Sequence, residues 1–195
     1  DGDAGEGEGE GGVGEGVVGE GEGAVGEGEG EGEGVQGAPF FVAVGYGGRR
    51  MISLDGSTWT HDVSDADNGG DDDNLLRGAC TGHTPNGERL AVAVGGSVHG
   101  RILTTTDGVT WTTALDDDKG WLGGCAMNDD GSIIVAVGSG RAIRSVDGGA
   151  TWVDPKIEFF GGHNWQARDA AFLDGTFAAV GDEGVSTSSD GVSWT

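Results

Sequence analysis

A short motif appears four times in this chain and constrains its fold more than any other feature. Each copy keeps an Asp, a Gly, a hydroxyl residue and a Trp, while the residues between them change. The copies are SLDGSTW (53–59), TTDGVTW (105–111), SVDGGATW (145–152) and SSDGVSW (188–194). Their Asp residues are 52, 40 and 43 positions apart. A pattern that returns at such a period is typical of a chain built from repeated structural units.

Each repeat also contains short extended segments. An apolar segment that ends in Gly precedes every motif, at 40–45, 90–95, 133–138 and 176–181. A second segment runs into the Asp, and the Trp opens a third, as in 58–63 and 110–115. Three repeats begin with a further stretch of small residues, at 75–81, 122–127 and 167–173. Four such segments per unit, joined by DG, GG and NG turns and without helical periodicity, predict an all-β fold.

Four-stranded antiparallel units at this period are typical of the blades of a β-propeller. The sequence contains about four blades. The first begins at its second strand and the last stops just inside its fourth, at Trp194 and Thr195. We therefore expect part of a larger propeller or an open one, with the missing blades supplied by more of the chain, by a homo-oligomer or by another chain. A solenoid is the structural alternative, although its repeats are usually shorter.

The motif SVDGGATW resembles the Asp-box, Ser/Thr-x-Asp-x-Gly-x-Thr-Trp, of the sialidase-type (BNR) β-propeller repeat, and the resemblance covers residues 40–195. In that family the box forms the turn between the third and fourth strands of a blade. The residue types suit this role, because Asp accepts backbone N–H groups, Gly adopts positive φ and Trp buries a large ring. We expect structural roles for Asp55, Trp59, Asp107, Trp111, Asp147, Trp152, Asp190 and Trp194.

The resemblance to sialidases ends at the boxes. The enzymes of that family use a tyrosine nucleophile with a glutamate partner and an arginine triad, whereas Tyr46, in the turn GYGGRR, is the single tyrosine of this chain. The chain is more similar to non-catalytic Asp-box proteins, such as secreted bacterial propellers and the photosystem assembly factor. We expect no catalytic activity and no cofactor. A glycosidase is the alternative, with carboxylates from 116–118 and Glu158 facing each other across about 5–9.5 Å.

Charge divides the chain into two parts. Residues 1–34 hold twelve of the 34 acidic residues and no Lys or Arg, so they carry half of the formal net charge of −24. Residues 1–37 are predicted to be an acidic Gly/Glu-rich low-complexity tail or linker, and residues 38–195 the propeller blades. A surface this acidic disfavours nucleic acid as a partner. No apolar run is long enough for a membrane-spanning helix, so membrane insertion is not expected.

The long connections between blades carry the candidate ligand-binding residues. Exposed rings beside Arg and His suit a sugar or a peptide, because rings stack on apolar faces while polar groups bind hydroxyls or amides. The candidates are Trp121, Phe159, Phe160, His163, Trp165, Arg168 and Arg77. A second interpretation stays open for Trp121 and Trp165, which both come directly before a predicted inner strand and are also placed to pack between blades.

Two further features have competing interpretations. The stretch DADNGGDDDN partly imitates a Ca²⁺ loop at Asp65, Asp67 and Gly69, but its twelfth position is Leu76 rather than Glu, so a solvated acidic loop is favoured and no metal site is expected. Cys80 and Cys125 are predicted to be small buried residues on successive inner strands. A disulfide between them is the less favoured alternative, because neighbouring inner strands are expected to diverge beyond a Cα distance of about 7 Å.

These observations predict a non-catalytic, secreted or envelope-associated propeller that binds a protein or carbohydrate partner through its inter-blade loops. A structural surface or filament component is a further alternative, because open strand edges favour association. The chain begins DGDAGEGEGE, which is interpreted as a mature form or an excised fragment.

Overall fold

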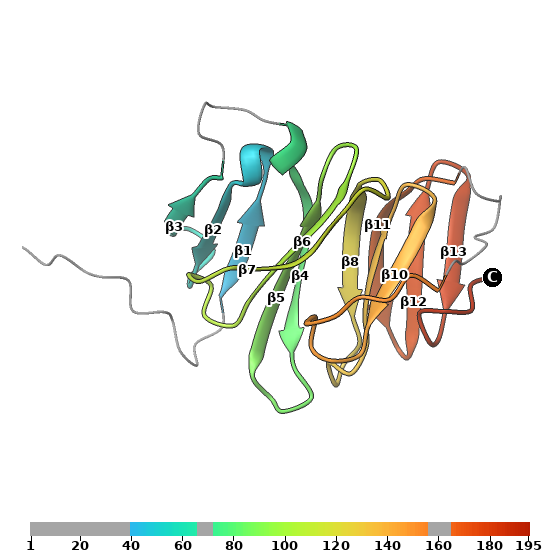
Figure 1. Ribbon diagram of the computed structural model, residues 1–195. Coiled ribbons are helices and arrows are strands. Elements are labelled where there is room, and N and C mark those ends of the chain that lie inside the picture. The colour runs from blue at the N-terminus through green and yellow to red at the C-terminus, as the bar shows by residue number, and fades with distance from the viewer. Residues whose placement is uncertain (1–39, 66–71, 156–164) are drawn as a thin grey trace, which may run out of the picture. The chain divides into compact units, whose positions relative to one another are not determined.

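The computed structural model describes residues 40–65, 72–155 and 165–195, and their regular structure is β-strand apart from two short 3₁₀ turns (Figure 1). The strands form four antiparallel sheets, one for each copy of the repeated motif. The prediction of an all-β fold is therefore confirmed. The acidic tail predicted at 1–37 lies outside the described residues, so the domain boundary stays a prediction.

Each sheet is formed by strands that follow one another along the chain. The first sheet contains β1 (Phe41–Val44), β2 (Arg50–Ser53) and β3 (Trp59–Val63), and the second contains β4 (Leu76–His83), β5 (Arg89–Gly95), β6 (Gly100–Thr105) and β7 (Thr112–Asp117). The third sheet contains β8 (Leu122–Met127), β9 (Ile134–Gly138) and β10 (Arg141–Ser145), and the fourth contains β11 (Ala167–Leu173), β12 (Thr176–Gly181) and β13 (Gly184–Ser188). The 3₁₀ turns are η1 (Tyr46–Gly48) and η2 (Asp72–Asn74).

The outermost strand varies among the sheets. It is complete in the second sheet as β7, but in the third it is reduced to a single bridge between Arg144 and Val153. Pro155 follows this bridge, and because proline has no backbone N–H it cannot continue the ladder. In the fourth sheet Thr187 and Thr195 exchange two backbone hydrogen bonds of 2.8 and 3.0 Å. Among the described sheets, the second has four strands and the other three have three strands each. All four are antiparallel sheets built from strands that are consecutive in the chain.

The glycine that ends the apolar strand allows a close backbone approach in the second, third and fourth sheets. A Cβ atom added to Gly95 would lie 2.0 Å from the carbonyl oxygen of Leu75, and one added to Gly138 would lie 2.0 Å from that of Trp121. In each case the chain that enters the inner strand crosses directly over the glycine, where the pairing register shifts. A side chain at this position would push the inner strand away from the sheet.

The core lies between successive sheets. Side chains alternate along each apolar strand, so one set faces the preceding sheet and the other set faces the following sheet. Between the second and third sheets, Val92 and Val94 pack with Ile134 and Ala136. Between the third and fourth sheets, Val135 and Val137 lie in one core cluster with Phe177 and Ala179. Both faces of an interior sheet are therefore apolar, which explains the unbroken apolar runs in the sequence.

The expectation that Cys80 and Cys125 are too far apart to pair is wrong. The two residues form a disulfide between β4 and β8, with a Cα–Cα distance of 5.7 Å. The inner strands approach each other because glycines line the contact. A Cβ atom on Gly78 would lie 2.8 Å from the carbonyl oxygen of Gly123. Neighbouring inner strands therefore converge here, within the reach of a disulfide.

Candidate functional site

The connections between strands lie at two ends of the sheets. We call one the turn end; it carries the four Asp motifs and the hairpin that joins β4 to β5. The other, the loop end, carries the entries to the inner strands and the turns that join β5 to β6 and β9 to β10. Backbone hydrogen bonds connect neighbouring parts of the loop end, from Gly96 N–H to Leu75 O (2.7 Å) and from Ser139 N–H to Trp121 O (3.0 Å). Antiparallel strands place alternate connections at opposite ends.

Each Asp motif is a hydrogen-bonded turn, and the first, second and fourth copies share one geometry. The third copy is one residue longer, and its Asp147 Oδ1 accepts the N–H of Thr151 four residues on (2.9 Å). In the first, Asp55 Oδ1 accepts the backbone N–H groups of Ser57 (2.8 Å) and Thr58 (2.7 Å). In the last, Asp190 Oδ1 accepts those of Val192 (2.8 Å) and Ser193 (2.8 Å). The glycine after the Asp has positive φ in all four turns. Each of these aspartates is a hydrogen-bond acceptor within its own turn.

These turns contain a second anchor besides the aspartate. A hydroxyl residue two positions before the Asp donates to its carboxylate and accepts a glycine N–H. For Ser53 these distances are 3.0 Å to Asp55 Oδ1 and 2.9 Å from Gly56 N. The corresponding residues are all buried, and they are Ser53, Thr105, Ser145 and Ser188. The signal was present, because every copy begins with Ser or Thr two residues before the Asp.

The hydrogen bonds hold the turn carboxylates in the ionised form. The N–H groups of Ser193 and Val192 lower the pKa of Asp190 to about 2 from its ordinary 3.8. The pKa of Asp55 is also lowered, chiefly by the N–H groups of Thr58 and Ser57. For Asp147 the hydroxyl of Thr151 is the main cause of the lowered pKa. Hydrogen bonds to the charged form favour that form.

We expect the free energy of unfolding to fall as the pH drops from about 4 toward 2. A carboxyl group whose pKa is lower in the folded state stabilises the fold above its unfolded pKa, and this stabilisation is lost as the pH falls through the folded pKa. For Asp190, discounted for its exposure, the loss is about 1 kcal/mol. Urea unfolding at a series of pH values measures it, with Asp190→Asn as the comparison. An equal pH dependence in the wild type and Asp190→Asn would exclude this contribution.

A cluster of one ring and two guanidinium groups lies at the loop end. The guanidinium carbons of Arg77 and Arg168 lie over the Trp121 ring, 5.0 and 5.1 Å from its centroid. Arg77 belongs to β4, Trp121 comes directly before β8, and Arg168 belongs to β11. Three consecutive sheets therefore each contribute one member. Cation–π contacts of this kind contribute about 0.5–1 kcal/mol at exposed sites.

The two arginines of this cluster differ in their other contacts. Arg168 forms two hydrogen bonds of 3.0 Å with the carboxylate of Asp182, which raise the pKa of Arg168. Arg77 donates Nε–H to the carbonyl oxygen of Gly96 at 3.0 Å. Within the described ranges of the chain, no carboxylate lies at ion-pair distance from Arg77. Its exposed guanidinium end is therefore available to an anionic group.

Other arginines at the loop end are bound to aspartates. The Oδ2 atom of Asp65 forms ion pairs with Arg50 (2.8 Å) and with Arg101 (2.9 Å), so it joins the first two sheets. Asp117 forms two hydrogen bonds of 2.9 Å with the buried guanidinium of Arg141 and thereby joins the second sheet to the third. Such two-point pairs have a fixed geometry. These arginines join sheets, in contrast to Arg77.

The structure brings together three of the seven predicted ligand-binding residues, Arg77, Trp121 and Arg168. Trp165 is 1% exposed and belongs to the apolar core between the third and fourth sheets. Its position agrees with the alternative interpretation that it packs between blades. The other three candidates, Phe159, Phe160 and His163, lie outside the described residues, as does the proposed catalytic Glu158.

The structure describes one of the three residues that resemble a Ca²⁺-binding loop, Asp65. One oxygen of its carboxylate is held by two guanidinium groups, while Asp67 and Gly69 lie outside the described residues. A search of the residues that are described finds no cluster of three or more His, Cys, Asp or Glu side chains arranged to hold a metal ion. In the same residues, no helix has the length and apolar character needed to cross a membrane.

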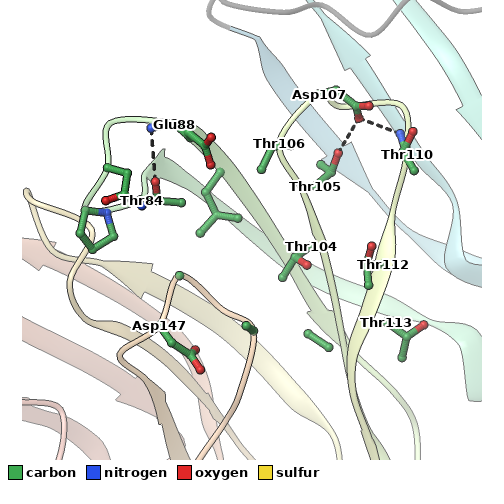
Figure 2. A pocket seen from close by; sticks show the side chains of 16 residues that line it. Thr84, Glu88, Thr104, Thr105, Thr106, Asp107, Thr110, Thr112, Thr113 and Asp147 are labelled. Carbon is green, nitrogen blue, oxygen red and sulfur yellow. Dashed lines mark hydrogen bonds between the residues drawn. The ribbon is translucent and has the colours of Figure 1, made fainter.

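A groove of about 790 Å³ lies at the turn end, between the second and third sheets. Figure 2 shows Asp107 and Asp147 in two neighbouring turns around it, with Thr84 and Glu88 on the β4–β5 hairpin. Seven lining residues are threonines, and they are Thr84, Thr104, Thr105, Thr106, Thr110, Thr112 and Thr113. The sequence analysis did not predict this groove, although the run TTTDGVTWTT contains six of the seven.

The lining of the groove is polar but has little free charge. The carboxylate of Asp107 accepts the hydroxyl of Thr105 (2.9 Å) and the N–H of Thr110 (2.7 Å), as Figure 2 shows. The hydroxyl of Thr84 accepts the N–H of Glu88 (3.2 Å). No aromatic ring is among the residues that line it. The groove therefore lacks the ring platform on which sugars usually stack, and the loop-end cluster is the stronger candidate site.

No protein-family model and no curated protein sequence matches the chain. Solved structures do match. One is a structure described as YCF48 bound to D1 peptide, which is 17% identical over 62% of this chain and 40% of that chain, with a TM-score of 0.47. Another is the WD40 β-propeller domain of Doa1, which is 14% identical over 61% of this chain and 38% of that chain, with a TM-score of 0.46.

A third match is the crystal structure of a nidogen/laminin complex. It is 13% identical over 76% of this chain and 53% of that chain, with a TM-score of 0.52. The chain thus spans about half, or less, of the length of the structures that it matches. At these identities the likeness is one of fold. Together with the four antiparallel sheets, it shows that the described part of the chain has a β-propeller fold.

Proposed function

We propose that this chain is a non-catalytic, protein-binding β-propeller domain that binds an acidic segment of its partner at the Arg77–Trp121–Arg168 cluster. One observation carries the proposal: Arg77 lies over the Trp121 ring with its guanidinium end exposed and without a carboxylate partner among the described residues. A partly exposed Trp ring and an Arg guanidinium group are the kinds of group that dominate binding energy in protein interfaces.

The chemistry of the cluster favours a carboxylate beside an apolar group. Arg77 would bind the carboxylate through its Nη atoms, and Trp121 would contact the adjoining apolar surface. Arg168 is held by Asp182, so its role is to position the ring and add positive potential. The chain as a whole is strongly acidic, with a formal net charge of −24. The negative charge repels an acidic partner segment from other parts of the surface. A local cationic cluster would therefore also restrict where the partner binds.

The pKa values of eight described aspartates do not suit the general acid of a glycosidase. A glycosidase needs one carboxyl group whose pKa is raised enough to hold a proton near neutral pH. In the described part of the chain, each aspartate whose pKa departs from its ordinary value has it lowered. They are Asp55, Asp62, Asp107, Asp117, Asp130, Asp147, Asp182 and Asp190. Such groups stay ionised and cannot act as the general acid.

We assign the domain to the Asp-box type of propeller on the geometry of its turns. The four turns share an Asp acceptor, a buried hydroxyl before it and a glycine of positive φ after it. The secreted or envelope location remains part of the proposal. The disulfide between Cys80 and Cys125 supports it, because structural disulfides persist in oxidising compartments.

The test uses an array of synthetic peptides, each made with a free C-terminal carboxylate and again as the C-terminal amide, and with Asp or Glu at varied positions. We expect the 195-residue chain to bind carboxylate-bearing peptides preferentially. Arg77→Gln should weaken this binding by about 10- to 100-fold, since hydrogen bonds to charged groups contribute about 1.5–3 kcal/mol. Biolayer interferometry on the best peptide measures the change.

Arg49→Gln is the matched control, because it removes the same charge from an exposed arginine of the first sheet that is paired with Asp62. We expect it to leave binding within about twofold, since exposed ion pairs contribute little. Equal binding by the wild type and Arg77→Gln would contradict the proposed site. If a glycan array gives a signal that depends on Arg77 and the peptide array gives none, the ligand of the cluster is a carbohydrate and not a protein.

A further inference from the structure

Strand β7 forms one edge of the second sheet, and the outer side of this strand is unpaired. It pairs with β6 on its inner side. Among the described residues, no backbone hydrogen bond runs from 112–117 to any segment other than β6. Alternate residues of an antiparallel strand direct their N–H and C=O groups to opposite sides. The outer side of β7 therefore offers main-chain donors and acceptors to a further strand.

The half of β7 at the turn end has none of the features that usually block a strand edge. Exposed edges are commonly blocked by proline or by charged side chains. Thr112 and Thr113 are exposed, uncharged and β-branched, and β7 contains no proline. At the loop end of the strand, Asp116 and Asp118 are exposed and carry negative charge. This edge therefore repels an acidic strand and admits a basic one.

The Thr-lined groove lies directly beside this edge. Thr112, Thr113 and Ala114 belong to β7 and line the groove. Figure 2 shows Thr112 and Thr113 on one side of it and Asp147 on the other. All of its lining residues come from the second and third sheets and their turns, and none comes from the first or the last sheet. A strand added along β7 would direct alternate side chains into the groove.

The groove carries negative charge that no cation of its lining balances. Its lining contains the carboxylates of Glu88, Asp107 and Asp147 and no Lys, Arg or His. Burial raises the pKa of Asp107, but hydrogen bonds from the N–H groups of Thr110 and Val109 bring this pKa below its ordinary value. The turn hydrogen bonds therefore keep the carboxylate charged and do not neutralise it. Such a groove disfavours an anionic ligand and suits an ammonium or guanidinium group.

Free hydroxyl groups add polar partners for a peptide. Thr106, Thr112 and Thr113 are exposed, and within the described chain their hydroxyls form no hydrogen bond. A threonine hydroxyl can donate one hydrogen bond and also accept. It can therefore bind either a C=O or an N–H group of an extended chain. The volume of about 790 Å³ lies within the range of about 300–1,000 Å³ that is usual for ligand sites.

We propose that the groove and the open edge of β7 bind an extended segment of a protein partner that has Lys or Arg at alternate positions. The main chain of this segment pairs with β7, and its basic side chains enter the groove toward Glu88, Asp107 and Asp147. In strand addition of this kind, main-chain hydrogen bonds provide affinity and pockets for alternate side chains provide specificity. The site lies at the turn end, so it is separate from the Arg77–Trp121–Arg168 cluster and has the opposite charge.

Fluorescence anisotropy with a labelled synthetic peptide, in which Lys alternates with Thr, tests the proposal on the 195-residue chain. We expect saturable binding and slower hydrogen exchange of the amides of 112–117 in the complex. Two further peptides are N-methylated, one at every Lys and the other at every Thr. Since only one edge of the peptide faces β7, one of these two should bind about tenfold more weakly than the other. Equal binding of the two methylated peptides would overturn pairing with β7.

Ala150→Arg tests the groove itself. Ala150 is exposed in the third Asp turn and lines the groove, so this substitution places a cation beside the basic side chains. It should weaken binding about tenfold or more, because like charges in a contact repel. Ser57→Arg is the matched control, since Ser57 is exposed at the same place in the first Asp turn and does not line the groove. We expect it to leave binding within about twofold.

The remaining outcomes separate this site from its alternatives. Arg77→Gln should leave binding of the Lys–Thr peptide unchanged, so failure of the loop-end site and failure of this site are distinguishable. Equal binding by the wild type and Ala150→Arg would overturn the groove as the site, and so would the absence of any binding. Spermine that binds as tightly as the peptide, with the same dependence on Ala150→Arg, would make a free polyamine the ligand and overturn the protein partner.

Discussion

Trp165→Ala should lower the free energy of unfolding by about 3–5 kcal/mol, the cost typical of removing a large buried aromatic side chain. The indole is 1% exposed and lies in the core between the third and fourth sheets. A Cβ atom on Gly181 would lie 2.8 Å from its Cε2 atom, so the surrounding backbone already touches the ring. Removing the ring would leave a cavity that this close-packed region cannot fill by small shifts. Urea unfolding followed by circular dichroism measures the loss.

Tyr46→Ala is the control for this substitution. Tyr46 is an exposed aromatic residue in η1, and its loss should change the free energy of unfolding by about 0.5 kcal/mol or less. A Trp165→Ala variant as stable as Tyr46→Ala would show that the core between these sheets does not depend on this residue. Because Trp165 is buried, Trp165→Ala is not a suitable test of ligand binding. A loss of binding in this variant would follow from unfolding. Substitutions at Arg77 avoid this ambiguity.

Removal of the Cys80–Cys125 disulfide should cost about 4 kcal/mol. The bond closes a loop with a sequence separation of 45, and the chain-entropy relation for a loop of this length gives that value. Without the bond, the second and third sheets would depend on apolar packing and on the Asp117–Arg141 pair for their attachment. Urea unfolding with and without a reducing agent measures the change.

The variant Cys80→Ala/Cys125→Ala provides the control, since its stability should not respond to the reducing agent. Mass spectrometry after alkylation reports whether the thiols were joined before reduction. Two alkylated thiols in the untreated protein would contradict the disulfide and remove its support for an oxidising compartment. Equal stability of the oxidised and reduced protein, with the bond shown to be cleaved, would contradict the expected entropy effect.

Local pattern predicted most strands well. The stretches LGGCAM, ARDAAFL and TFAAVG correspond to β8, β11 and β12 at almost every residue. Their residue patterns and flanking glycines are short-range features, which the structure retains. The fourth strand of the third unit was predicted in full but is reduced to one bridge at Val153. Pro155, two residues later, was visible in the sequence and explains this difference.

The candidate site was predicted only in part. Trp121 lies 44 residues after Arg77 and 47 residues before Arg168. The contact among the three depends on how three sheets stack. Trp121 and Trp165 look alike in sequence, since they lie one and two residues before an inner strand, yet Trp121 is partly exposed and Trp165 is buried. The Thr-rich groove likewise requires two sheets, so its lining could not be assigned from one segment.

The sequence by itself determined the repeated unit: its extended segments, its Asp turns and the glycine that ends each apolar strand. These depend on contacts within a few residues, such as that of Asp190 with the N–H groups of Val192 and Ser193. Only the tertiary structure decided which residues meet between units. The disulfide, the Arg77–Trp121–Arg168 cluster and the Thr-lined groove all depend on the distance and angle between sheets. Those quantities are set by side-chain packing across each interface, which no local pattern encodes.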